Sequence, residues 1–273
     1  MVRNKRKGSG AGCIALCVAM QLAGCAGKIP LPKHLRVSGL GQLRTKLDAA
    51  QAPTKSYFAD VDLTYFGPAG RVRGNASVAV RRPDQFRFDV RGPHGGVIQA
   101  FATDGKRVRL LMVGESRFIE DDATVANLTR LLPIAPVELD AAGWVSIFFG
   151  ELRIPEGASL HYDDERGHFV VTWNAGVRTI TVRVDPATSR AVRVEIHASD
   201  KLLSRVLVKE RGPMGIPVRL RFHAPGDKDV DMRIKLHDID RDPDGMGEGT
   251  FVLKAPRGVS VESLNDRADP QGP

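Results

Sequence analysis

The sequence predicts an α+β fold: one large, curled antiparallel sheet, an incomplete β-barrel, with about three helices covering its concave face. Apolar and polar residues alternate with a period of two over most of residues 57–113 and 158–239. This pattern is typical of antiparallel strands with one wet face. Helical spacing is confined to three short segments near the start and middle of the chain, so the helices cannot connect successive strands as parallel crossovers. A sheet of about a dozen strands is expected to curl.

Length and composition agree with a folded chain of ordinary charge. The 273 residues are 42% hydrophobic and 26% charged, which excludes disorder over most of the sequence. The net charge of +8 is misleading, because residues 1–24 carry four basic residues and no acid. Beyond residue 24 there are 36 basic against 32 acidic residues. That balance does not favour a nucleic-acid partner.

The N-terminus has the features of an export signal. Arg3, Lys5, Arg6 and Lys7 precede an apolar stretch from Ala11 to Gly24, which is too short to span a bilayer. The stretch ends in Leu-Ala-Gly-Cys25, which resembles a bacterial lipobox. The resemblance implies that residues 1–24 are removed and that Cys25 is acylated, with a palmitate-type chain among the lipids. A signal peptide cut elsewhere is the alternative.

Two further inferences depend on this signal. Cys13 and Cys17 would leave with it and Cys25 would be acylated, so no thiol remains for a disulfide or a metal site. Residue 26 is Ala rather than Asp, which by resemblance to the enteric sorting rule favours the outer membrane, with the protein facing the periplasm. We therefore expect a lipid-anchored protein of the cell envelope.

The mature chain divides into three parts. Residues 25–35 form the acylated cysteine and a Pro-containing tether, residues 36–255 the folded domain, and residues 256–273 a flexible tail with three prolines. Strands are expected at 57–66, 71–81, 85–91, 96–103, 106–113, 158–163, 168–174, 177–184, 190–197, 202–210, 216–223 and 229–239. The Asp104-Gly105 pair is a hairpin turn signal between two of them.

Helices are expected in three places. The first follows Ser38 and carries Leu40, Leu43 and Leu47. The second lies at 125–132, after the cap candidates Asp121 and Asp122. The third lies at 137–149 and is almost wholly apolar.

One face of the later strands, together with the third helix, is the expected binding surface. A curled sheet covered by few helices can leave an apolar hollow for a hydrophobic ligand, or the helices can fill it. The two alternatives carry equal weight here. The residues expected to line such a cavity are Val192, Val194, Ile196, Val218, Leu220, Phe222, Met232 and Ile234, with Trp144 and Phe148 of the third helix.

The order of several short motifs resembles the LolA/LolB-like lipoprotein-localisation superfamily, and most closely LolB. After the lipobox and a short helix come Tyr65-Phe66-Gly67 and then the segment from Arg87 to Gly95. Further matches are Asp104-Gly105, the segment from Pro136 through Trp144 to Gly150, and the strand Gly215-Ile216-Pro217. The resemblance implies a half-barrel with a helical lid over an apolar cavity, which receives or carries acylated lipoproteins. A periplasmic carrier would be a partner.

The sequence departs from that pattern at one loop. LolB has an exposed leucine in a Pro-Leu-Gly context, used in handing cargo to the membrane, whereas this chain has Pro93-His94-Gly95. A histidine inserts poorly into a bilayer. These three residues are therefore either a membrane-contacting loop or a solvated turn.

Other polar clusters have two interpretations each. Asp240, Asp242 and Asp244 with Gly245 match the start of a calcium loop, but the expected bidentate glutamate is missing, so an acidic surface loop is favoured and no metal site is expected. The alternating arginines at 71, 73, 81, 87 and 91 could meet anionic lipid or simply be a solvated face. No nucleophile, phosphate or dinucleotide motif occurs, so no catalytic residue and no cofactor are expected.

The leading hypothesis is an outer-membrane-anchored lipoprotein that binds an acyl chain or a lipidated protein in its cavity, as a receptor or carrier. The alternative is a non-catalytic structural or regulatory envelope lipoprotein whose cavity is packed shut and whose surface binds protein partners. An enzyme is a distant third.

Overall fold

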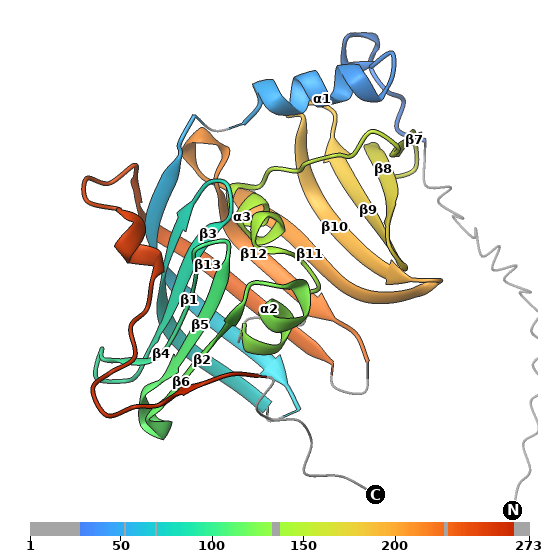
Figure 1. The fold of residues 1–273 in the computed structure, drawn as a ribbon. Coiled ribbons are helices and arrows are strands. Elements are labelled where there is room, and N and C mark those ends of the chain that lie inside the picture. Colours follow the sequence, from blue (N-terminus) through green and yellow to red (C-terminus); the bar gives the residue numbers. More distant parts are fainter. Residues whose placement is uncertain (1–27, 52, 69, 133–136, 227–228, 265–273) are drawn as a thin grey trace, which may run out of the picture.

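The computed structural model describes residues 28–51, 53–68, 70–132, 137–226 and 229–264. Within these residues a single sheet of fourteen strands curls around two of three α-helices and does not close on itself (Figure 1). The predicted α+β class and the curled, open sheet are therefore confirmed. One detail differs: β14 pairs parallel with β6, so the sheet is mixed rather than purely antiparallel.

The first half of the chain forms α1 (Leu40–Ala49), β1 (Ser56–Gly67), β2 (Gly70–Arg81), β3 (Gln85–Arg91), β4 (Val97–Thr103), β5 (Arg107–Met112) and β6 (Arg117–Asp122). Two further helices follow, α2 (Val125–Leu131) and α3 (Ala141–Phe149). The second half forms β7 (Ser159–Asp163), β8 (His168–Ala175), β9 (Arg178–Asp185), β10 (Arg190–Ala198), β11 (Lys201–Arg211), β12 (Pro217–Ala224), β13 (Val230–Arg241) and β14 (Val261–Glu262).

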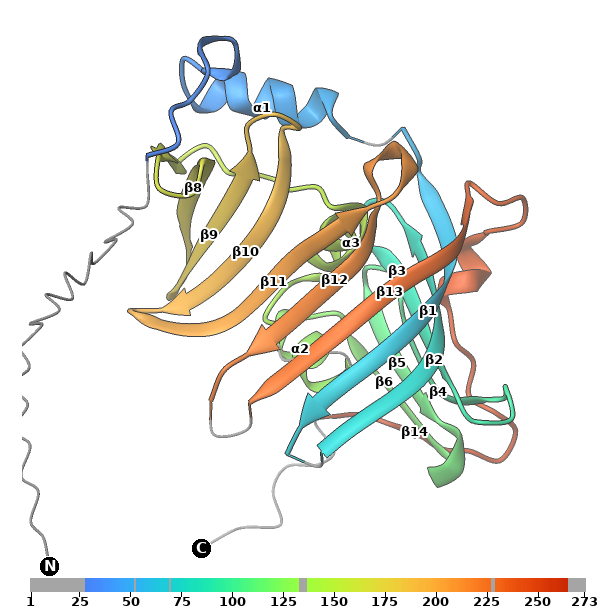
Figure 2. The same ribbon diagram turned by 180° about the vertical axis from the view of Figure 1, so that it is seen from behind.

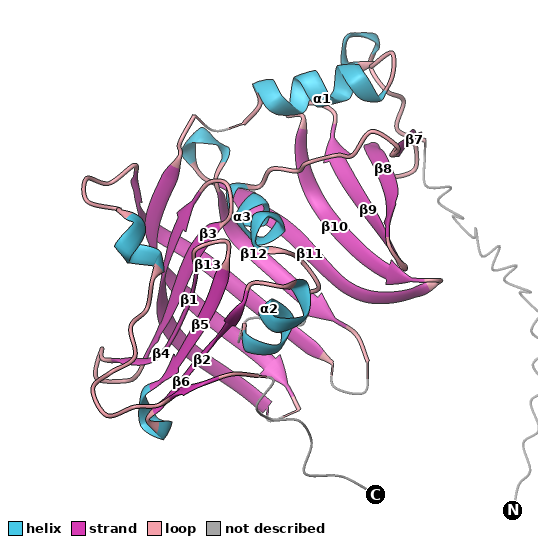
Figure 3. Ribbon diagram, viewed as in Figure 1, coloured by secondary structure: helices cyan, strands magenta, loops and turns pink. Residues whose placement is uncertain are grey.

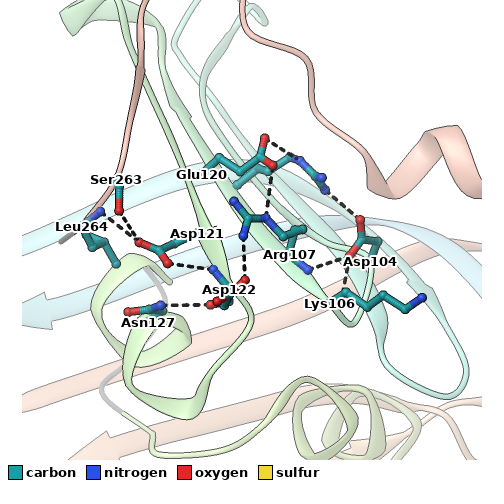
Figure 4. Close-up of polar contacts among 10 residues, drawn as sticks. Asp104, Lys106, Arg107, Glu120, Asp121, Asp122, Asn127, Ser263 and Leu264 are labelled. Atoms are coloured by element: carbon teal, nitrogen blue, oxygen red, sulfur yellow. Dashed lines mark hydrogen bonds and ion pairs between the residues drawn. The ribbon is translucent and has the colours of Figure 1, made fainter. Parts of the chain in front are cut away.

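Sequential hairpins build each half of the sheet. The strand order is β14-β6-β5-β4-β3-β2-β1-β13-β12-β11-β10-β9-β8-β7, so β1 and β13 join the two halves by pairing antiparallel. Short turns connect most neighbours, and Gly105 has the positive φ of 88° that the β4–β5 turn requires. The Asp104 carboxylate accepts hydrogen bonds from the amides of Lys106 and Arg107 at 2.9 and 2.8 Å, which fixes this turn (Figure 4).

The main core fills the concave side of the sheet. Helices α2 and α3 lie inside the curl, and α1 lies across the end of the sheet formed by β8–β10 (Figure 3). Trp144 of α3 packs against Phe222 and Phe86 with ring-centroid distances of 5.7 and 6.3 Å. All three side chains are fully buried. The buried hydroxyl of Tyr57 on β1 donates to the carbonyl of Phe148 at 3.1 Å and so ties α3 to the sheet.

A smaller core lies on the outer face of β4–β6. The segment after β13 crosses this face, where Leu253 packs with Ala100, Ala102 and Phe118. The Asp121 carboxylate then accepts hydrogen bonds from the Ser263 hydroxyl and the Leu264 amide at 2.9 and 3.0 Å (Figure 4). The segment expected to be a flexible tail from residue 256 is thus bound to the sheet as far as Leu264.

The expected tether also contacts the domain. The Ile29 amide donates to the carbonyl of Asp164 and the Tyr162 hydroxyl donates to the carbonyl of Ile29, at 2.6 and 3.0 Å. A short 3₁₀ turn follows at Lys33–Leu35. Lys28 and Ile29 therefore lie against the β7–β8 hairpin, and residues 1–27, including Cys25, lie outside the described part of the chain.

Two helix starts differ from the expected caps. Thr124, not Asp121 or Asp122, caps α2, because its hydroxyl accepts a hydrogen bond from the Asn127 amide at 3.2 Å. Helix α3 begins at Ala141 rather than at 137, because the Asp140 carboxylate accepts from the Gly143 amide at 2.7 Å. In both cases a local side-chain cap decides where the helix begins.

Asp242, one of the three aspartates that resemble the start of a calcium loop, has a structural role instead. Its carboxylate accepts hydrogen bonds from the amides of Ser56 and Lys55 at 2.8 and 2.9 Å, at the start of β1. Partial burial raises the pKa of Asp242, but these amides outweigh that effect, so the pKa lies below its usual value. The charged form of Asp242 thus supports the β1–β13 junction.

We expect Tyr57→Phe to lower the free energy of unfolding by about 1–2 kcal/mol, because the Phe148 carbonyl near the end of α3 loses its buried partner. Urea denaturation measures this change. Tyr65→Phe is the matched control, because no hydrogen bond of the Tyr65 hydroxyl occurs among the described residues. Equal stability of the two variants would contradict the anchoring role of Tyr57.

We expect Asp242→Ala to destabilise the fold by about 1 kcal/mol, equally with added calcium and with EDTA. Because the folded pKa of Asp242 is lowered, its contribution is present above the unfolded value of about 3.9 and is lost as the pH falls through the folded value. Thermal unfolding between pH 3 and 7 measures both effects. The control is Asp244→Ala. Stabilisation of the parent by calcium that Asp242→Ala abolishes would show a calcium site instead.

Candidate functional site

Helix α3 is apolar except for Ser146, which is why it lies inside the curl. Its buried residues are Ala141, Trp144, Val145, Ile147, Phe148 and Phe149. A helix of this composition has no face suited to water, so the sheet must surround it. The candidate site is the space that α3 leaves uncovered on the concave side.

A cavity of about 270 Å³ lies between α3 and strands β8–β10. Its apolar lining consists of Leu139, Ala142, Gly143, Ile147, Leu152, Trp173, Ile180 and Val194, and its polar lining of Asp140, Ser146 and Arg153. Apolar walls with a few polar groups are typical of ligand sites, although the volume is slightly below the usual range of about 300–1,000 Å³.

The sheet wall of this cavity consists of inward-facing residues that α3 covers only in part. Trp173 of β8 pairs directly with Ile180 of β9. Both are half-buried, whereas Val171 and Val182, the next inward residues, are fully buried. The apolar face of the sheet therefore continues past the helix, and the cavity lies along the side of α3 that carries Ala142, Gly143, Ser146 and Ile147.

Buried contacts hold the C-terminal end of α3. Arg82 forms a two-bond ion pair with Glu151, with one N–O distance of 2.6 Å, and its guanidinium lies 4.1 Å from the ring centre of Phe149. Arg211 donates to the carbonyl of Gly150 at 3.3 Å. Burial, with the nearby charge of Arg190 as a lesser cause, lowers the pKa of Arg211 to about 10. This end of the helix is firmly fixed.

The N-terminal side of α3 is held more weakly. Glu138, just before the helix, forms a bidentate ion pair with Arg178 of β9 at 2.7 and 2.9 Å. Their side chains are 38% and 31% exposed, so water screens the pair. In addition, the buried indole N–H of Trp144 has no hydrogen-bond partner among the described residues. Such an unpaired donor costs about 1–3 kcal/mol.

The structure brings most of the predicted cavity residues together, but in the packed core. Val194, Ile196, Leu220, Phe222, Met232, Ile234, Trp144 and Phe148 all belong to the main core cluster. Of the ten predicted residues, only Val194 lines the 270 Å³ cavity. Trp144 and Phe148 are completely buried and fill the middle of the curl.

Val192 and Val218 lie outside that cluster. In β10 the pairing with β9 shifts between Ala191 and Arg193, so Val192 is the extra residue of a β-bulge. Val218 lies at the start of β12 beside Gly212, where the pairing of β11 with β12 also shifts. A period-two pattern does not reveal such bulges.

Several lining residues were not predicted. Leu139 and Leu152 flank α3, and Trp173 and Ile180 lie near the β8–β9 turn. One signal was present in the sequence: Trp173 is a large aromatic residue on the apolar face of a strand, next to the exposed turn at Val177.

The predicted loop Pro93-His94-Gly95 forms the turn between β3 and β4. The Gly95 amide donates to the carbonyl of Gly92 at 3.0 Å, and the His94 side chain is exposed. The turn lies far from α3, at the end of the sheet where β1 meets β2 (Figure 2). Among the described helices, none has the length and apolarity needed to cross a membrane.

One cluster on the outer face contains metal-ligating side chains, namely Asp60, His237 and Asp238. The Asp60 carboxylate lies 3.4 Å from the guanidinium of Arg91, and the His237 ring is 2.8 Å from the Asp238 carboxylate. The bond to Asp238 is the main reason that the pKa of His237 is raised. These contacts make an ion-pair network, and the absence of a metal site stays a prediction.

Comparisons with known proteins give a likeness of fold. No family model matches the sequence, and no curated protein matches it. A LolA superfamily protein from Nitrosomonas europaea superposes with a TM-score of 0.57 and 13% identity, over 80% of this chain and 99% of that one. A domain named for outer membrane lipoprotein sorting, from Vibrio parahaemolyticus, has a TM-score of 0.56 and 13% identity over 78% and 95% of the two chains.

A third structure extends the group. A DUF1329 family protein from Desulfovibrio piger superposes with a TM-score of 0.55 and 11% identity, over 77% of this chain and 94% of that one. At these identities the likeness concerns the fold alone. The chain thus has the curled half-barrel fold of LolA superfamily proteins.

Proposed function

We propose that this protein is a lipoprotein of the cell envelope that binds an acyl chain or a lipidated protein noncovalently, as a receptor or carrier. The observation that carries the proposal is the apolar cavity between α3 and β8–β10 in a fold shared with lipoprotein-sorting proteins. We further propose that Cys25 is acylated and that the lipid anchors the protein in the outer membrane, where it faces the periplasm. A periplasmic carrier would be its partner, and the protein would catalyse no reaction.

The size of the cavity limits what it holds in this conformation. A volume of 270 Å³ admits part of one acyl chain, because sites for drug-sized ligands begin at about 300 Å³. Burial of the chain would supply about 25 cal/mol for each Å² of apolar surface. A longer chain needs more space, which an outward shift of the N-terminal side of α3 would provide.

The contacts of α3 support such a shift. Its C-terminal end is fixed by Tyr57, Arg82 and Arg211, whereas its N-terminal side is held by the half-buried pair of Glu138 and Arg178. The unpaired indole N–H of Trp144 further lowers the cost of displacing the helix. We infer that α3 pivots about its C-terminal end when a chain enters.

The polar side of the cavity suits a head group. Arg153 lines the cavity, its side chain is exposed, and it forms no ion pair among the described residues. A guanidinium in this position can pair with a carboxylate or a phosphate. It would hold the polar end of the cargo while the apolar end enters.

The second candidate is a structural or regulatory lipoprotein that binds protein partners. The observation in its favour is that Trp144 and Phe148, expected to line the cavity, are fully buried in the core. Native mass spectrometry of the full chain, released gently from bacterial membranes, separates the two functions. A copurified lipid or acylated peptide supports the carrier. A clean mass that takes up no added acyl peptide supports the second function.

We expect Ile180→Trp to fill the cavity and to weaken binding of a palmitoylated peptide at least tenfold, with little loss of stability because residue 180 is half-buried. Fluorescence titration of the labelled peptide measures the Kd. Val177→Trp is the matched control, since Val177 is 84% exposed and lies outside the cavity lining. Equal binding by the two variants would place the acyl site elsewhere.

We expect Glu138→Gln to speed entry of the same peptide several-fold, because the N-terminal side of α3 is released from β9. The free energy of unfolding should change by only about 0.2–1 kcal/mol, since water still reaches and screens this half-buried ion pair. Stopped-flow fluorescence gives the association rate. Glu115→Gln, which breaks an exposed pair with Arg117 far from α3, is the control. An unchanged association rate in Glu138→Gln would argue against the pivot.

A further inference from the structure

A cluster of cations, here called the basic patch, covers the outer face of the sheet from β11 to β2. Its members are Arg71, Arg73, Lys209, Arg219, Arg221, Arg233 and Lys235. The four neighbouring strands β12, β13, β1 and β2 are side by side on this face, with the helices behind them (Figure 2). The patch is therefore on the opposite side of the sheet from the apolar cavity.

The strand register makes the patch continuous. Arg221 lies directly opposite Arg233, and Arg219 lies opposite Lys235. Thr64 on β1 lies between Arg233 and Arg73, because it pairs with both. A groove of about 520 Å³ runs over this part, lined by Lys209, Arg219, Arg221, Arg233, Lys235, Asp62, Thr64, Leu220 and Ile234.

The acids around the patch do not balance it. Asp231 pairs with Arg221 and Arg233 at 2.8 and 3.2 Å, Glu210 pairs with Arg219 at 2.9 Å, and Asp62 lies 4.0 Å from Lys235. Seven cations thus face three acids. The patch therefore has four more positive than negative charges. Residues 25–273 as a whole also have four more basic than acidic residues, so the rest of this segment has equal numbers of the two.

Like charges in directly opposed positions of a sheet are destabilising. Elsewhere on the outer face the pattern is different: Arg87 pairs with Asp89 at 2.8 Å, and Arg91 lies 3.4 Å from Asp60. Within the patch, Arg71, Arg73 and Lys209 have no ion pair among the described residues, which leaves the patch cationic at a cost to the isolated fold. A bound anion would offset that cost.

Apolar side chains border the patch at one end. Phe66 lies between the guanidinium groups of Arg71 and Arg233, at 5.3 and 5.0 Å from the ring centre. Exposed Val97 and Ile98 lie at the same end of the sheet, at the start of β4.

We propose that the basic patch is a contact surface for the anionic headgroups of a phospholipid bilayer. Arginine forks match phosphate oxygens, and basic clusters are attracted to anionic lipid. The half-exposed Phe66 is the residue that would enter the interfacial layer beside the cations. The positive charge alone would also fit an acidic protein as the partner. The apolar side chains beside the patch favour the bilayer, because its interfacial layer accepts both kinds of residue. The inference does not depend on acylation or on the cavity.

Hydrogen–deuterium exchange of the full chain tests the proposal, with nanodiscs of neutral phosphatidylcholine or with 30% phosphatidylglycerol. We expect slower exchange in peptides covering residues 63–75 and 231–236 with the anionic discs only. Raising NaCl from 0.05 to 0.5 M should reverse the effect. Each arginine contributes about fivefold to affinity for an anionic surface, so Arg71→Gln with Arg73→Gln should weaken binding about 25-fold. The concentration of anionic discs that gives half of the full protection measures this change.

The control is Lys106→Gln with Lys254→Gln, which removes two exposed charges outside the patch and should keep the protection. Circular dichroism establishes that both double variants are folded. The proposal is overturned if exchange is unchanged with anionic discs, if neutral discs protect equally, or if both double variants lose protection alike. Protection by polyglutamate but not by anionic discs would assign the patch to an acidic protein and overturn the membrane proposal.

Discussion

The fold depends on one constraint: a curled sheet that does not close has an apolar concave face that no second sheet covers. Helix α3 satisfies it, because its six buried residues include Trp144, Phe148 and Phe149 and leave almost no polar surface. A helix of this kind is stable only when surrounded, and the sheet is stable only when filled. The buried hydrogen bond from Tyr57, the ion pair of Arg82 and the carbonyl contact of Arg211 all serve to hold this helix in place.

The cavity follows from a mismatch in size between helix and sheet. Nine helical residues extend only about 14 Å, whereas the strands beyond the helix continue through β10, β9, β8 and β7. Beside α3, the inward-facing Trp173 and Ile180 pack only partly against the core and are half-buried. An apolar hollow beside a short helix is thus a direct consequence of this architecture, and the weakly held side of α3 adjoins it.

Part of the outer face of the sheet is covered by another segment of the chain, and part is exposed to solvent. Over β4–β6 the segment after β13 packs Leu253 onto alanine side chains, so this part is closed. Over the basic patch, from β11 to the first half of β2, no described segment covers the sheet, and cations in excess remain exposed (Figure 2). The pairing of β1 with β13 brings Phe66 and Arg233 together from positions far apart in the chain. The two faces of one sheet can therefore meet different partners, an acyl chain inside and a charged surface outside.

The sequence by itself determined the class of the fold, the position of nearly every strand and the three helices, because period-two and helical patterns are local and strong. It also determined that Val194, Ile196, Leu220 and Phe222 face inward. It did not reveal the bulge at Val192 or the binding of residues 256–264 to β6, since each depends on contacts with a neighbouring segment. It also did not single out the cap at Thr124, because the adjacent Asp121 and Asp122 are equally good cap residues. Only the tertiary structure decided which inward residues line a cavity and which outer cations lack acids. Both properties depend on distances between strands far apart in the chain, and a linear pattern contains no such distances.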